Sequence, residues 1–324
     1  FDTVLHGKLI QILRDVGFDD RDVHIISNLY WNQTAVVRVG QDMTDAVCIS
    51  RGVRQECVLS PLLFNLYSEC IMAEALEDLG AGVRINGVII NNIRYADDTV
   101  LLADNLEDLQ AMLDAVALHS SRMGLSLNPK KTKWMVFRKP RCGGSSVDDC
   151  FLNSGGVALE RVGRFKYLGS HLSESCDDGG EIRSRIEQAR TAFIKMRSVL
   201  TTRDLSMALR HRLLRCYVFS VLLYGSESWT LTDAMCKKLQ AFEMWSYRRM
   251  LRIPWTARRS NADVLSLMNG RVEVLNTIKR RKLEYFGHVL RNDKYGLLQL
   301  IIQGKIAGRR SQGRRRTSWL RNLR

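Results

Sequence analysis

The chain has 324 residues, of which 45% are hydrophobic, and its formal net charge is +15. This length and composition fit a globular protein with one large core or two smaller ones, and they exclude a disordered chain. The longest apolar run, CYVFSVLLYG at 216–225, is shorter than the roughly 20 residues that span a bilayer, and no signal-like start is present. We therefore expect an intracellular protein of the nucleus or cytoplasm, with no membrane partner.

The first half of the chain alternates helical and strand-like patterns. The break between the first two helices is DVGFDDRD, where Gly17 gives a stop and the Asp cluster a cap. In chain order, the expected elements are two helices within 3–33, a strand pair within 34–50 turning near Gly40, a long helix from Pro61 closed by Gly80, a small antiparallel sheet with an Asn-Gly turn within 83–103, a helix over 105–123 and a strand over 133–138.

The second half is mostly helical. PRCGGSSVDDC at 140–150 predicts a loop and an internal boundary, and RFKYLGSHL at 164–172 predicts a strand and turn. The later helices are expected at 181–200, 204–224, 233–251, 261–268 and 273–290. A mixed α/β region followed by helices indicates a catalytic-type body and a helical domain.

Basic residues are concentrated at the end of the chain. From Arg271 to Arg324 there are fifteen Lys or Arg against three acidic residues, a balance of +12. Such a region favours a polyanionic partner, most simply nucleic acid, because Lys and Arg neutralise phosphates with release of counterions. A solvated basic face, or a tail that aids solubility, is the alternative.

The eight cysteines form no CxxC pair and lie mostly in apolar segments. This spacing favours reduced core thiols over zinc ligands or disulfides. The tryptophans divide between core and surface: Trp229 and Trp245 are expected in the core, whereas Trp319, among basic residues, fits either packing or stacking on a base.

Two adjacent carboxylates, Asp97 and Asp98, stand between apolar runs in NNIRYADDTVLLADN. Like charges held close together repel each other unless a cation intervenes, so a metal ion is expected. Successive residues of a strand face opposite ways, and at a hairpin bend one carboxylate can be the ligand while the other supports it. Magnesium suits hard oxygen ligands, and a two-metal site needs a carboxylate from another strand. The alternative is a solvated turn.

Four motifs occur in the order RGVRQECVLSPLLFNLY, YADDTVLLA, GLSLNPKKTKWMVF and FKYLGSHL. This order resembles that of LINE-type, non-LTR retrotransposon reverse transcriptases. YADDTVLLA (95–103) resembles their catalytic box, and RGVRQECVLSPLLFNLY (51–67) their nucleotide-contacting segment. GLSLNPKKTKWMVF (124–137) looks like the Asn-x-x-Lys-Thr box, and FKYLGSHL (165–172) like the primer-grip turn. The helical tail, with KRRKLEYFGHVLR and GRRRTSWLRNL, is similar to the thumb and the region after it, so the likeness covers nearly the whole chain.

The resemblance implies an α+β fold. This is the right-hand polymerase palm, a small antiparallel sheet with packed helices, followed by an α-helical basic thumb and extension. The implied parts are a palm with partial fingers at 1–150, a primer-grip region at 151–178, and the thumb with its extension at 179–324. The implied reaction is RNA-templated attack of a primer 3'-hydroxyl on a deoxynucleoside triphosphate. Its partners are an RNA template, a DNA primer and deoxynucleoside triphosphates, and its cofactors are two Mg²⁺ ions, with Mn²⁺ as a substitute.

Residue by residue, the resemblance assigns four kinds of role. The expected catalytic residues are Asp97 as metal ligand, Asp98 as its supporting carboxylate, and Lys131 near the leaving pyrophosphate. Phe1, Arg54, Gln55 and Tyr95 would contact the nucleotide, the template or the primer end, with Ser60 and Pro61 shaping the pocket. Tyr167, Leu168 and Gly169 would hold the primer backbone. Nucleic-acid contacts are expected from Lys279, Arg280, Arg281, Lys282, Arg314, Arg315 and Arg316. For Lys279 to Lys282, a solvated face without nucleic-acid contacts is an equally open alternative. For Arg314 to Arg316, the alternative is a nuclear-targeting patch.

Two departures from the family pattern stand out. The family's first metal-binding Asp lies five residues before the aromatic matching Phe1, so it is expected ahead of this chain, which looks cut from something longer. Glu56 replaces a Gly, adding bulk and negative charge beside a triphosphate. We therefore expect little polymerase activity from this chain alone. A non-catalytic nucleic-acid-binding remnant is the second hypothesis, and a group II intron maturase a weaker third.

Overall fold

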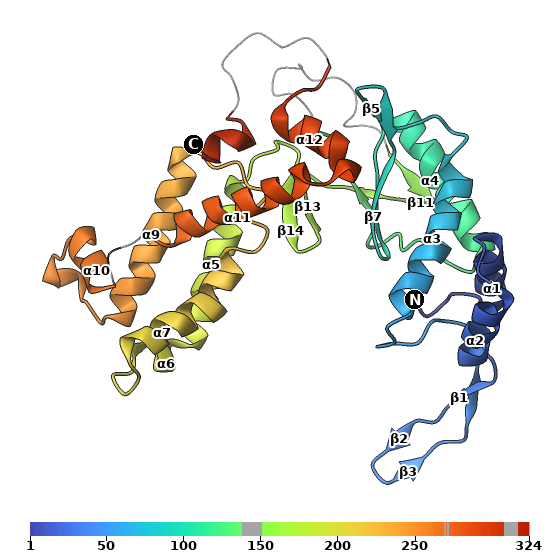
Figure 1. The fold of residues 1–324 in the computed structure, drawn as a ribbon, viewed down its shortest axis with the longest axis horizontal. Helices are drawn as coiled ribbons and strands as arrows, with labels where there is room; N and C mark the ends of the chain where they lie inside the picture. Colours follow the sequence, from blue (N-terminus) through green and yellow to red (C-terminus); the bar gives the residue numbers. More distant parts are fainter. Residues whose placement is uncertain (138–150, 269, 271, 308–316, 324) are drawn as a thin grey trace. The chain divides into compact units, whose positions relative to one another are not determined.

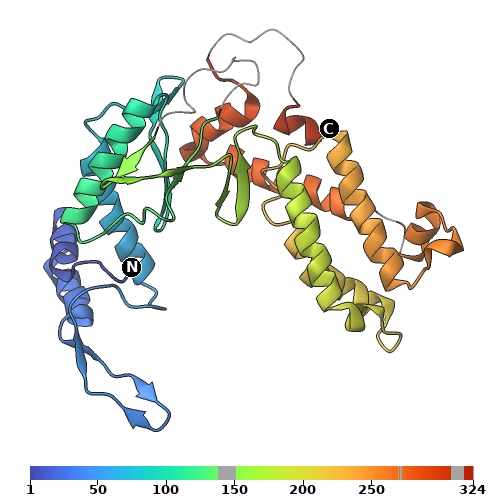
Figure 2. The same cartoon turned by 180° about the vertical axis from the view of Figure 1, so that it is seen from behind.

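The computed structural model describes residues 1–137, 151–268, 270, 272–307 and 317–323. The chain divides into two compact units. Unit 1 is Phe1–Trp134 with Gly144–Arg161, and unit 2 is Met135–Gly143 with Val162–Arg324. Figures 1 and 2 draw them from two sides. The expected loop at 140–150 and the predicted contacts Arg314, Arg315 and Arg316 lie outside the described residues.

Unit 1 combines four described helices with short strand pairs. The helices are α1 (His6–Asp15), α2 (Asp20–Tyr30), α3 (Ser60–Leu76) and α4 (Leu106–Arg122). The antiparallel pairs are β1 (Gln33–Ala35) with β4 (Val47–Ile49), β2 (Arg38–Val39) with β3 (Asp42–Met43), β5 (Val83–Ile85) with β6 (Val88–Ile90), β7 (Asn92–Tyr95) with β8 (Asp98–Leu101), and β10 (Asn153–Ser154) with β11 (Val157–Ala158); β9 (Lys133–Trp134) pairs in parallel with β12 (Glu160–Arg161).

Local chemistry sets the boundaries of these elements. Gly17 adopts φ 94° after α1, and the Asp19 side chain caps α2 by accepting the Asp22 N–H at 2.7 Å. Gly40, at φ 66°, turns β2 into β3, so the expected strand pair within 34–50 is confirmed as a longer hairpin arm (Figure 1). Pro61 lies in the first turn of α3, and Gly80 follows the helix at φ 57°.

The sheet expected within 83–103 is two separate hairpins. Asn86 and Gly87, at φ 50° and 86°, make the predicted Asn-Gly turn between β5 and β6. The middle strand of the prediction is broken at Asn91, and β7 begins a second hairpin. Asn is a poor strand residue, which the run of Ile and Val around it concealed.

Two apolar clusters bury α3 in unit 1. One joins α1 and α2 to the first half of α3, where Leu63, Phe64 and Tyr67 are buried. The other joins the second half of α3 to Met112 and Val116 of α4. In Figure 1, α3 and α4 run side by side with β7 next to them. Helices with small, mainly antiparallel sheets agree with the expected α+β class.

Unit 2 begins with a hairpin and continues almost entirely as helices. Its elements are β13 (Arg164–Tyr167), β14 (Ser170–Ser173), α5 (Gly179–Lys195), α6 (Arg197–Thr201), α7 (Met207–Leu214), the π-helical η1 (Arg215–Phe219), α8 (Ser220–Leu222), α9 (Asp233–Met250), η2 (Trp255–Ala257), α10 (Asn261–Leu267), α11 (Val274–Leu290), η3 (Asp293–Tyr295), α12 (Gly296–Gln303) and η4 (Trp319–Leu323). The expected helices are confirmed, but α12 was missed because a short apolar run does not distinguish helix from strand.

One apolar cluster forms the core of unit 2. Its largest member is Trp229, which is 1% exposed, and Trp245 packs against it with its ring 5.5 Å from that of Phe242. The core role expected for Trp229 is confirmed, whereas Trp245 is partly buried and packs at the edge of the core, with Arg190 and Arg249 over its ring. None of the helices in the described part of the chain is long and apolar enough to cross a bilayer.

Tyr67 offers a test of the unit 1 core. Its buried hydroxyl donates to the carbonyl of Met123 at 2.6 Å and accepts the Leu5 N–H at 3.4 Å. The variant Tyr67→Phe leaves both backbone groups without this partner, so we expect it to lower the free energy of unfolding of unit 1 by about 1–2 kcal/mol. Urea unfolding measures the loss, and Tyr217→Phe, at an exposed ring, is the control expected to change stability little. Equal effects of the two variants would contradict this role for Tyr67.

Candidate functional site

The two carboxylates lie at a hairpin bend. Tyr95 at the end of β7 is opposite Asp98 at the start of β8, and Ala96 and Asp97 make the turn, with Ala96 in the left-handed region at φ 52°. Opposite residues of an antiparallel pair share a face, so Tyr95 and Asp98 project to the same side. All three polar side chains are exposed. The expected bend is confirmed; the metal-binding role of Asp97 and Asp98 stays a prediction.

The other face of this hairpin is attached to α3. Arg94 pairs with Glu69 at 2.7 Å and donates to the carbonyl of Ser68 at 3.3 Å. Leu101 packs against the apolar cluster shared by α3 and α4. The hairpin therefore has one face held by an ion pair and apolar contacts while the turn carries the carboxylates into solvent.

The N-terminal residues pair with the segment that resembles the nucleotide-contacting motif. The Val53 N–H donates to the carbonyl of Phe1 at 3.0 Å, and the Gly52 N–H to that of Val4 at 2.7 Å. A Cβ on Gly52, at φ 94°, would lie 2.9 Å from the carbonyl oxygen of Asp2. Glycine is required by this close approach.

Phe1 also contacts α3 directly. Its ring stacks on that of Phe64 with centroids 4.2 Å apart and planes inclined by 15°. Phe64 and Ser68 are one helical turn apart, so Phe1 and the Arg94 anchor attach to neighbouring positions on one face of α3. The structure thus associates the Phe1 segment and the carboxylate hairpin with the same helix.

Arg54 and Gln55 are exposed at the end of this paired segment. The buried Ser60 hydroxyl donates to the carbonyl of Arg54 at 2.6 Å, which ties the segment to the first turn of α3. Between them, Glu56 adopts φ 60°, in the left-handed region that favours glycine. The departure from the family pattern at Glu56 therefore also carries backbone strain.

Lys131 lies on a capped turn after α4. The Asn128 side chain accepts the N–H groups of Lys130 and Lys131 at 3.2 and 3.3 Å, and its carbonyl accepts the Thr132 hydroxyl at 2.9 Å. The Asn-x-x-Lys-Thr spacing thus builds its own turn, and the Lys131 side chain is left exposed.

A metal site would need more donors than the structure assembles. Asp97 and Asp98 supply hard carboxylate oxygens of the kind that Mg²⁺ prefers. In the described ranges, however, no group of three His, Cys, Asp or Glu side chains could hold a metal ion. Asp97 and Asp98 thus give this bend two donors whose chemistry fits a divalent cation.

In unit 2, the predicted primer-grip residues form the turn of the β13–β14 hairpin. Leu168 and Gly169 adopt φ 47° and 81°. The Tyr224 hydroxyl donates to the carbonyl of Leu168 at 2.8 Å, and the Arg185 guanidinium donates to that of Gly169. Arg185 also lies over the Tyr224 ring, 4.5 Å from its centroid. Two side chains therefore hold the turn by its carbonyl oxygens.

A buried carboxylate orients this clamp. Glu181 is 3% exposed and accepts Arg185 Nε–H at 2.6 Å, the His171 backbone N–H at 3.0 Å and the His171 Nδ1 at 2.8 Å. Burial opposes ionisation, but the hydrogen bonds from Arg185 and His171 outweigh it and hold the pKa of Glu181 below its usual value. Sequence reasoning missed these clamp residues; the Glu181–Arg185 spacing of four was the one signal for them.

The basic residues of α11 do not form one uniform face. Lys279 and Arg280 are exposed, while Arg281 is half-buried and donates to the carbonyl of Leu223 at 2.8 Å. Lys282 is 0% exposed and donates to the carbonyl of Trp229 at 2.7 Å. The Lys282 ammonium is thus enclosed by protein, and the nucleic-acid contacts expected of these four residues stay predictions.

Trp319 lies beside this lysine rather than projecting freely. The Lys282 ammonium is 4.3 Å from the centre of its ring, and the indole N–H donates to the carbonyl of Glu227 at 2.7 Å. Of the two roles left open for Trp319, packing is therefore the one its contacts favour.

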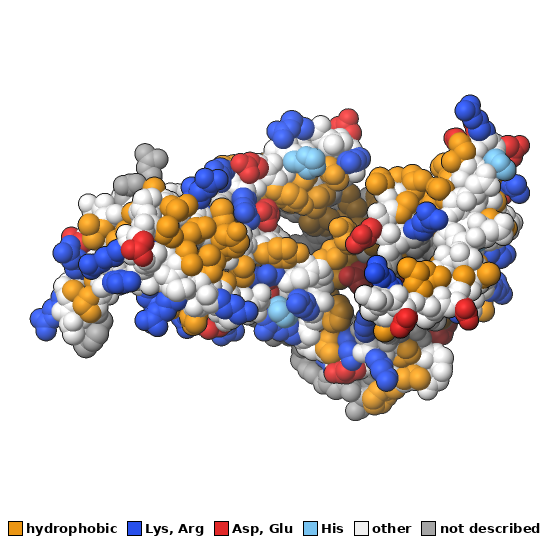
Figure 3. All heavy atoms as spheres, turned by 90° about the horizontal axis from the view of Figure 1, so that it is seen from below, with side chains coloured by type: hydrophobic (Ala, Val, Ile, Leu, Met, Phe, Trp, Pro, Cys, Tyr) orange, Lys and Arg blue, Asp and Glu red, His pale blue; other side chains and the backbone are white. Residues whose placement is uncertain are grey.

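On the face drawn in Figure 3, Lys and Arg side chains are spread among apolar and neutral surface rather than collected in one patch.

Glu56 gives a stability test. We expect Glu56→Gly to raise the free energy of unfolding of unit 1 by about 0.5–1 kcal/mol, because glycine relieves the left-handed strain. The control Glu107→Gly, at an exposed position in the first turn of α4, should lower it by a similar amount. Thermal unfolding of both variants measures whether each one raises or lowers stability. Destabilisation by Glu56→Gly would contradict the inference that Glu56 is strained.

Glu181 gives a pH test. Because its folded-state pKa is lowered, its stabilisation is present above the usual glutamate range and is lost as the pH falls through the folded-state value. We expect Glu181→Gln to cost about 3 kcal/mol near neutral pH, where Arg185 is left buried without its counterion. The difference in free energy of unfolding between Glu181→Gln and the unmodified chain should shrink as the pH falls below the usual glutamate range.

The control for this pH test lies on the same helix. Glu187 pairs with Arg190 at 3.2 Å, but its side chain is 65% exposed. Glu187→Gln should therefore change stability little at any pH. Urea unfolding of the three proteins over a pH series gives the comparison, and a Glu181→Gln penalty that does not vary with pH would contradict the lowered pKa.

The chain is similar in sequence to known proteins. Residues 1–172 match the family model described as reverse transcriptase (RNA-dependent DNA polymerase). An uncharacterized transposon-derived protein of Caenorhabditis elegans is 30% identical over 212 residues, which cover 64% of this chain and 75% of that protein.

Two further relatives are Pol polyproteins of R2 elements. The retrovirus-related Pol polyprotein from the type-1 retrotransposable element R2 of Popillia japonica is 33% identical over 175 residues, covering 52% of this chain and 24% of the polyprotein. That of the type-2 element R2DM of Drosophila melanogaster is 26% identical over 203 residues, covering 60% of this chain and 19% of the polyprotein. The chain thus spans a quarter or less of these two relatives. With the family model matching more than half of its length, this chain belongs to the reverse transcriptase family of the non-LTR retrotransposons.

Proposed function

We propose that this chain is the template–primer-binding and polymerising part of a retrotransposon RNA-directed DNA polymerase. The observation that carries the proposal is the exposed hairpin bend bearing Asp97 and Asp98, fixed to α3 by Arg94. Family membership and the stacking of Phe1 on the same helix support it. The reaction would join a primer 3'-hydroxyl to the α-phosphate of a deoxynucleoside triphosphate, directed by an RNA template.

The residues of unit 1 would mainly bind and orient the reactants. Phe1 would pack against the sugar of the incoming nucleotide, and Arg54 and Gln55 would contact the nucleotide or template from the adjoining segment. Tyr95 would lie under the primer end, next to Asp98, whose face it shares. Lys131, exposed on its capped turn, would attract the leaving pyrophosphate by its charge.

The turn of Tyr167, Leu168 and Gly169 would hold the primer backbone. Its two carbonyl oxygens are already occupied by Tyr224 and Arg185, so the turn is held rigidly before any strand binds. A turn fixed in this way loses little conformational freedom on binding. This rigidity supports a positioning role for the hairpin.

Divalent ions, magnesium or manganese, would activate the primer hydroxyl and neutralise the pyrophosphate when bound. Asp97 would be the ligand contributed by this chain, and Asp98 its support. The family's first box provides a third carboxylate, five positions ahead of the aromatic that Phe1 matches. Because the described residues assemble only two such donors, residues 1–324 alone should bind these ions weakly.

Glu56 should also weaken the activity of this chain. Its negative charge stands beside Gln55, where the triphosphate would lie, and like charges repel. A chain that keeps its nucleic-acid-binding surface while losing synthesis is therefore the second candidate function. The charge of Glu56 is the observation that favours it.

Primer extension on an RNA template distinguishes the two candidates. We expect residues 1–324 to bind an RNA–DNA hybrid with affinity that falls steeply with salt, and to extend the primer very little. Adding an N-terminal segment with Asp five positions before Phe1, together with Glu56→Gly, should restore synthesis. In that restored chain, Asp97→Asn should reduce the rate by at least about a hundredfold, by the loss of one metal ligand.

The matched control is Asp104→Asn, which removes an exposed carboxylate just after the same hairpin. It should leave the rate within about twofold, as expected for an exposed side chain away from the site. If the restored chain binds the hybrid but still makes no DNA, the binding remnant is the better description. Strong synthesis by residues 1–324 would overturn our proposal that they are nearly inactive alone.

A further inference from the structure

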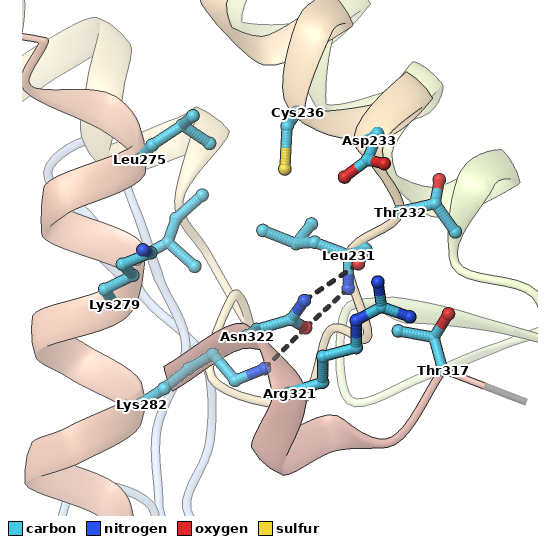
Figure 4. Close-up of a pocket in the computed structure, with 11 residues that line it drawn as sticks. Leu231, Thr232, Asp233, Cys236, Leu275, Lys279, Lys282, Thr317, Arg321 and Asn322 are labelled. Carbon is cyan, nitrogen blue, oxygen red and sulfur yellow. Dashed lines mark hydrogen bonds between the residues drawn. The ribbon is translucent and has the colours of Figure 1, made fainter. Parts of the chain in front are cut away.

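Unit 2 contains a cavity of about 360 Å³ beside α11, and the proposed polymerase chemistry does not use it. Its walls are the start of α9, one face of α11 and the C-terminal segment that includes η4 (Figure 4). The volume falls within the range of about 300–1,000 Å³ typical of small-molecule sites. All of its lining belongs to unit 2.

The wall of this cavity is held in place by partly buried polar contacts. The Asn322 side chain accepts the Leu231 N–H at 2.7 Å and donates to the Leu231 carbonyl at 2.8 Å, as a neighbouring strand would. Lys282 donates to the Asn322 side chain at 3.1 Å and to the Trp319 carbonyl at 3.2 Å. The site is therefore formed before a ligand arrives, which lowers the entropic cost of binding.

The charge of the lining favours an anion. Lys279, Lys282 and Arg321 line the cavity, and Asp233 is the one carboxylate among the lining residues. Burial lowers the pKa of Lys282 to about 8, against the opposing effect of Asp178. The Lys282 ammonium donates to Trp229, Trp319 and Asn322 and is 0% exposed, so the cations open to a ligand are Lys279 and Arg321.

The remaining surface favours a ring with hydrogen-bond donors. Leu275 is half-buried and Leu231 is 6% exposed, and these two side chains give one side of the cavity an apolar surface. In Figure 4, the Asp233 carboxylate and the Cys236 thiol both point from α9 into the space above Leu231. A carboxylate accepts hydrogen bonds only, so a ligand beside Asp233 should present N–H groups.

We infer that this cavity binds one guanine nucleotide unit, either free or within a single strand. Arg321 holds the phosphate, and the base lies against Leu231 and Leu275. Asp233 accepts the two adjacent N–H groups at the edge of guanine. The site lies in unit 2 and needs neither a metal ion nor the polymerising residues of unit 1.

Cys236 provides a local readout of occupancy. In the whole chain, without divalent metal, alkylation of Cys236 is followed by mass spectrometry, with the exposed Cys216 as internal control. We expect guanosine 5'-monophosphate to slow alkylation at Cys236 and not at Cys216. Inorganic phosphate and guanosine, each at the same concentration, should protect much less.

The same assay separates the two sources of the nucleotide. A pentaribonucleotide with one central guanine among uridines should protect Cys236 if the site accepts a strand, and the all-uridine pentamer should not. Protection by free nucleotide alone assigns the site to the free ligand. Either pattern supports a guanine nucleotide site, whereas equal protection by the two pentamers overturns the assignment of guanine.

Two variants test the assigned contacts. Arg321→Ala should weaken protection by the nucleotide at least about tenfold, as for a lost charge-assisted hydrogen bond, whereas Arg203→Ala, at an exposed arginine outside the lining, should not. Asp233→Asn removes a negative charge, so it should strengthen protection by inorganic phosphate. It should weaken protection by guanosine 5'-monophosphate, because an amide cannot accept both N–H groups as well as a carboxylate does.

The inference is overturned if the nucleotide leaves Cys236 unprotected, if phosphate alone protects as well, or if Asp233→Asn strengthens nucleotide protection. Because no primer, template or metal is present, these outcomes are independent of primer extension. A chain that protects Cys236 but makes no DNA retains this site while the polymerase proposal fails, and the reverse outcome is equally distinguishable.

Discussion

Burial of α3 is the constraint on which unit 1 depends. One apolar cluster covers its first half and another its second half, so the helix can neither rotate nor slide without exposing Leu63 or Leu76. Phe1 stacks on this helix, and Arg94 anchors the carboxylate hairpin to it one turn further along. Groups that are far apart in the chain acquire defined places because they share one rigid support.

Unit 2 adds buried polar groups to its apolar core. Glu181 and Arg185 together hold a tight turn by its carbonyl oxygens, and Lys282 joins the C-terminal segment to the middle of α11. A low-dielectric setting strengthens such contacts when every member has a partner and makes each one costly to lose. These networks give the unit directional contacts, which an apolar core alone does not provide.

The parts of the fold that could be predicted are those set by neighbouring residues. Turns at Asn86-Gly87 and at Gly40, the cap at Asp19 and the start of α3 at Pro61 follow from local backbone chemistry, and the hairpin bend at Asp97 follows from its flanking strands. Lys282 shows the limit: a run of four basic residues predicts charge, but burial depends on a segment almost forty positions away. The clamp residues His171, Glu181, Arg185 and Tyr224 were missed for the same reason, because their association exists only in the folded unit.

The pairing of residues 1–5 with 51–53 has a kinetic consequence. This contact closes a long loop that contains α1, α2 and the β1–β4 arm, and closure of a long loop costs entropy before its hydrogen bonds can compensate. The helices inside the loop can form from local contacts first. The segment that leads into Arg54 and Gln55 would then be completed late in folding and would be among the first parts of unit 1 to open in the native state, on a timescale that hydrogen exchange can follow.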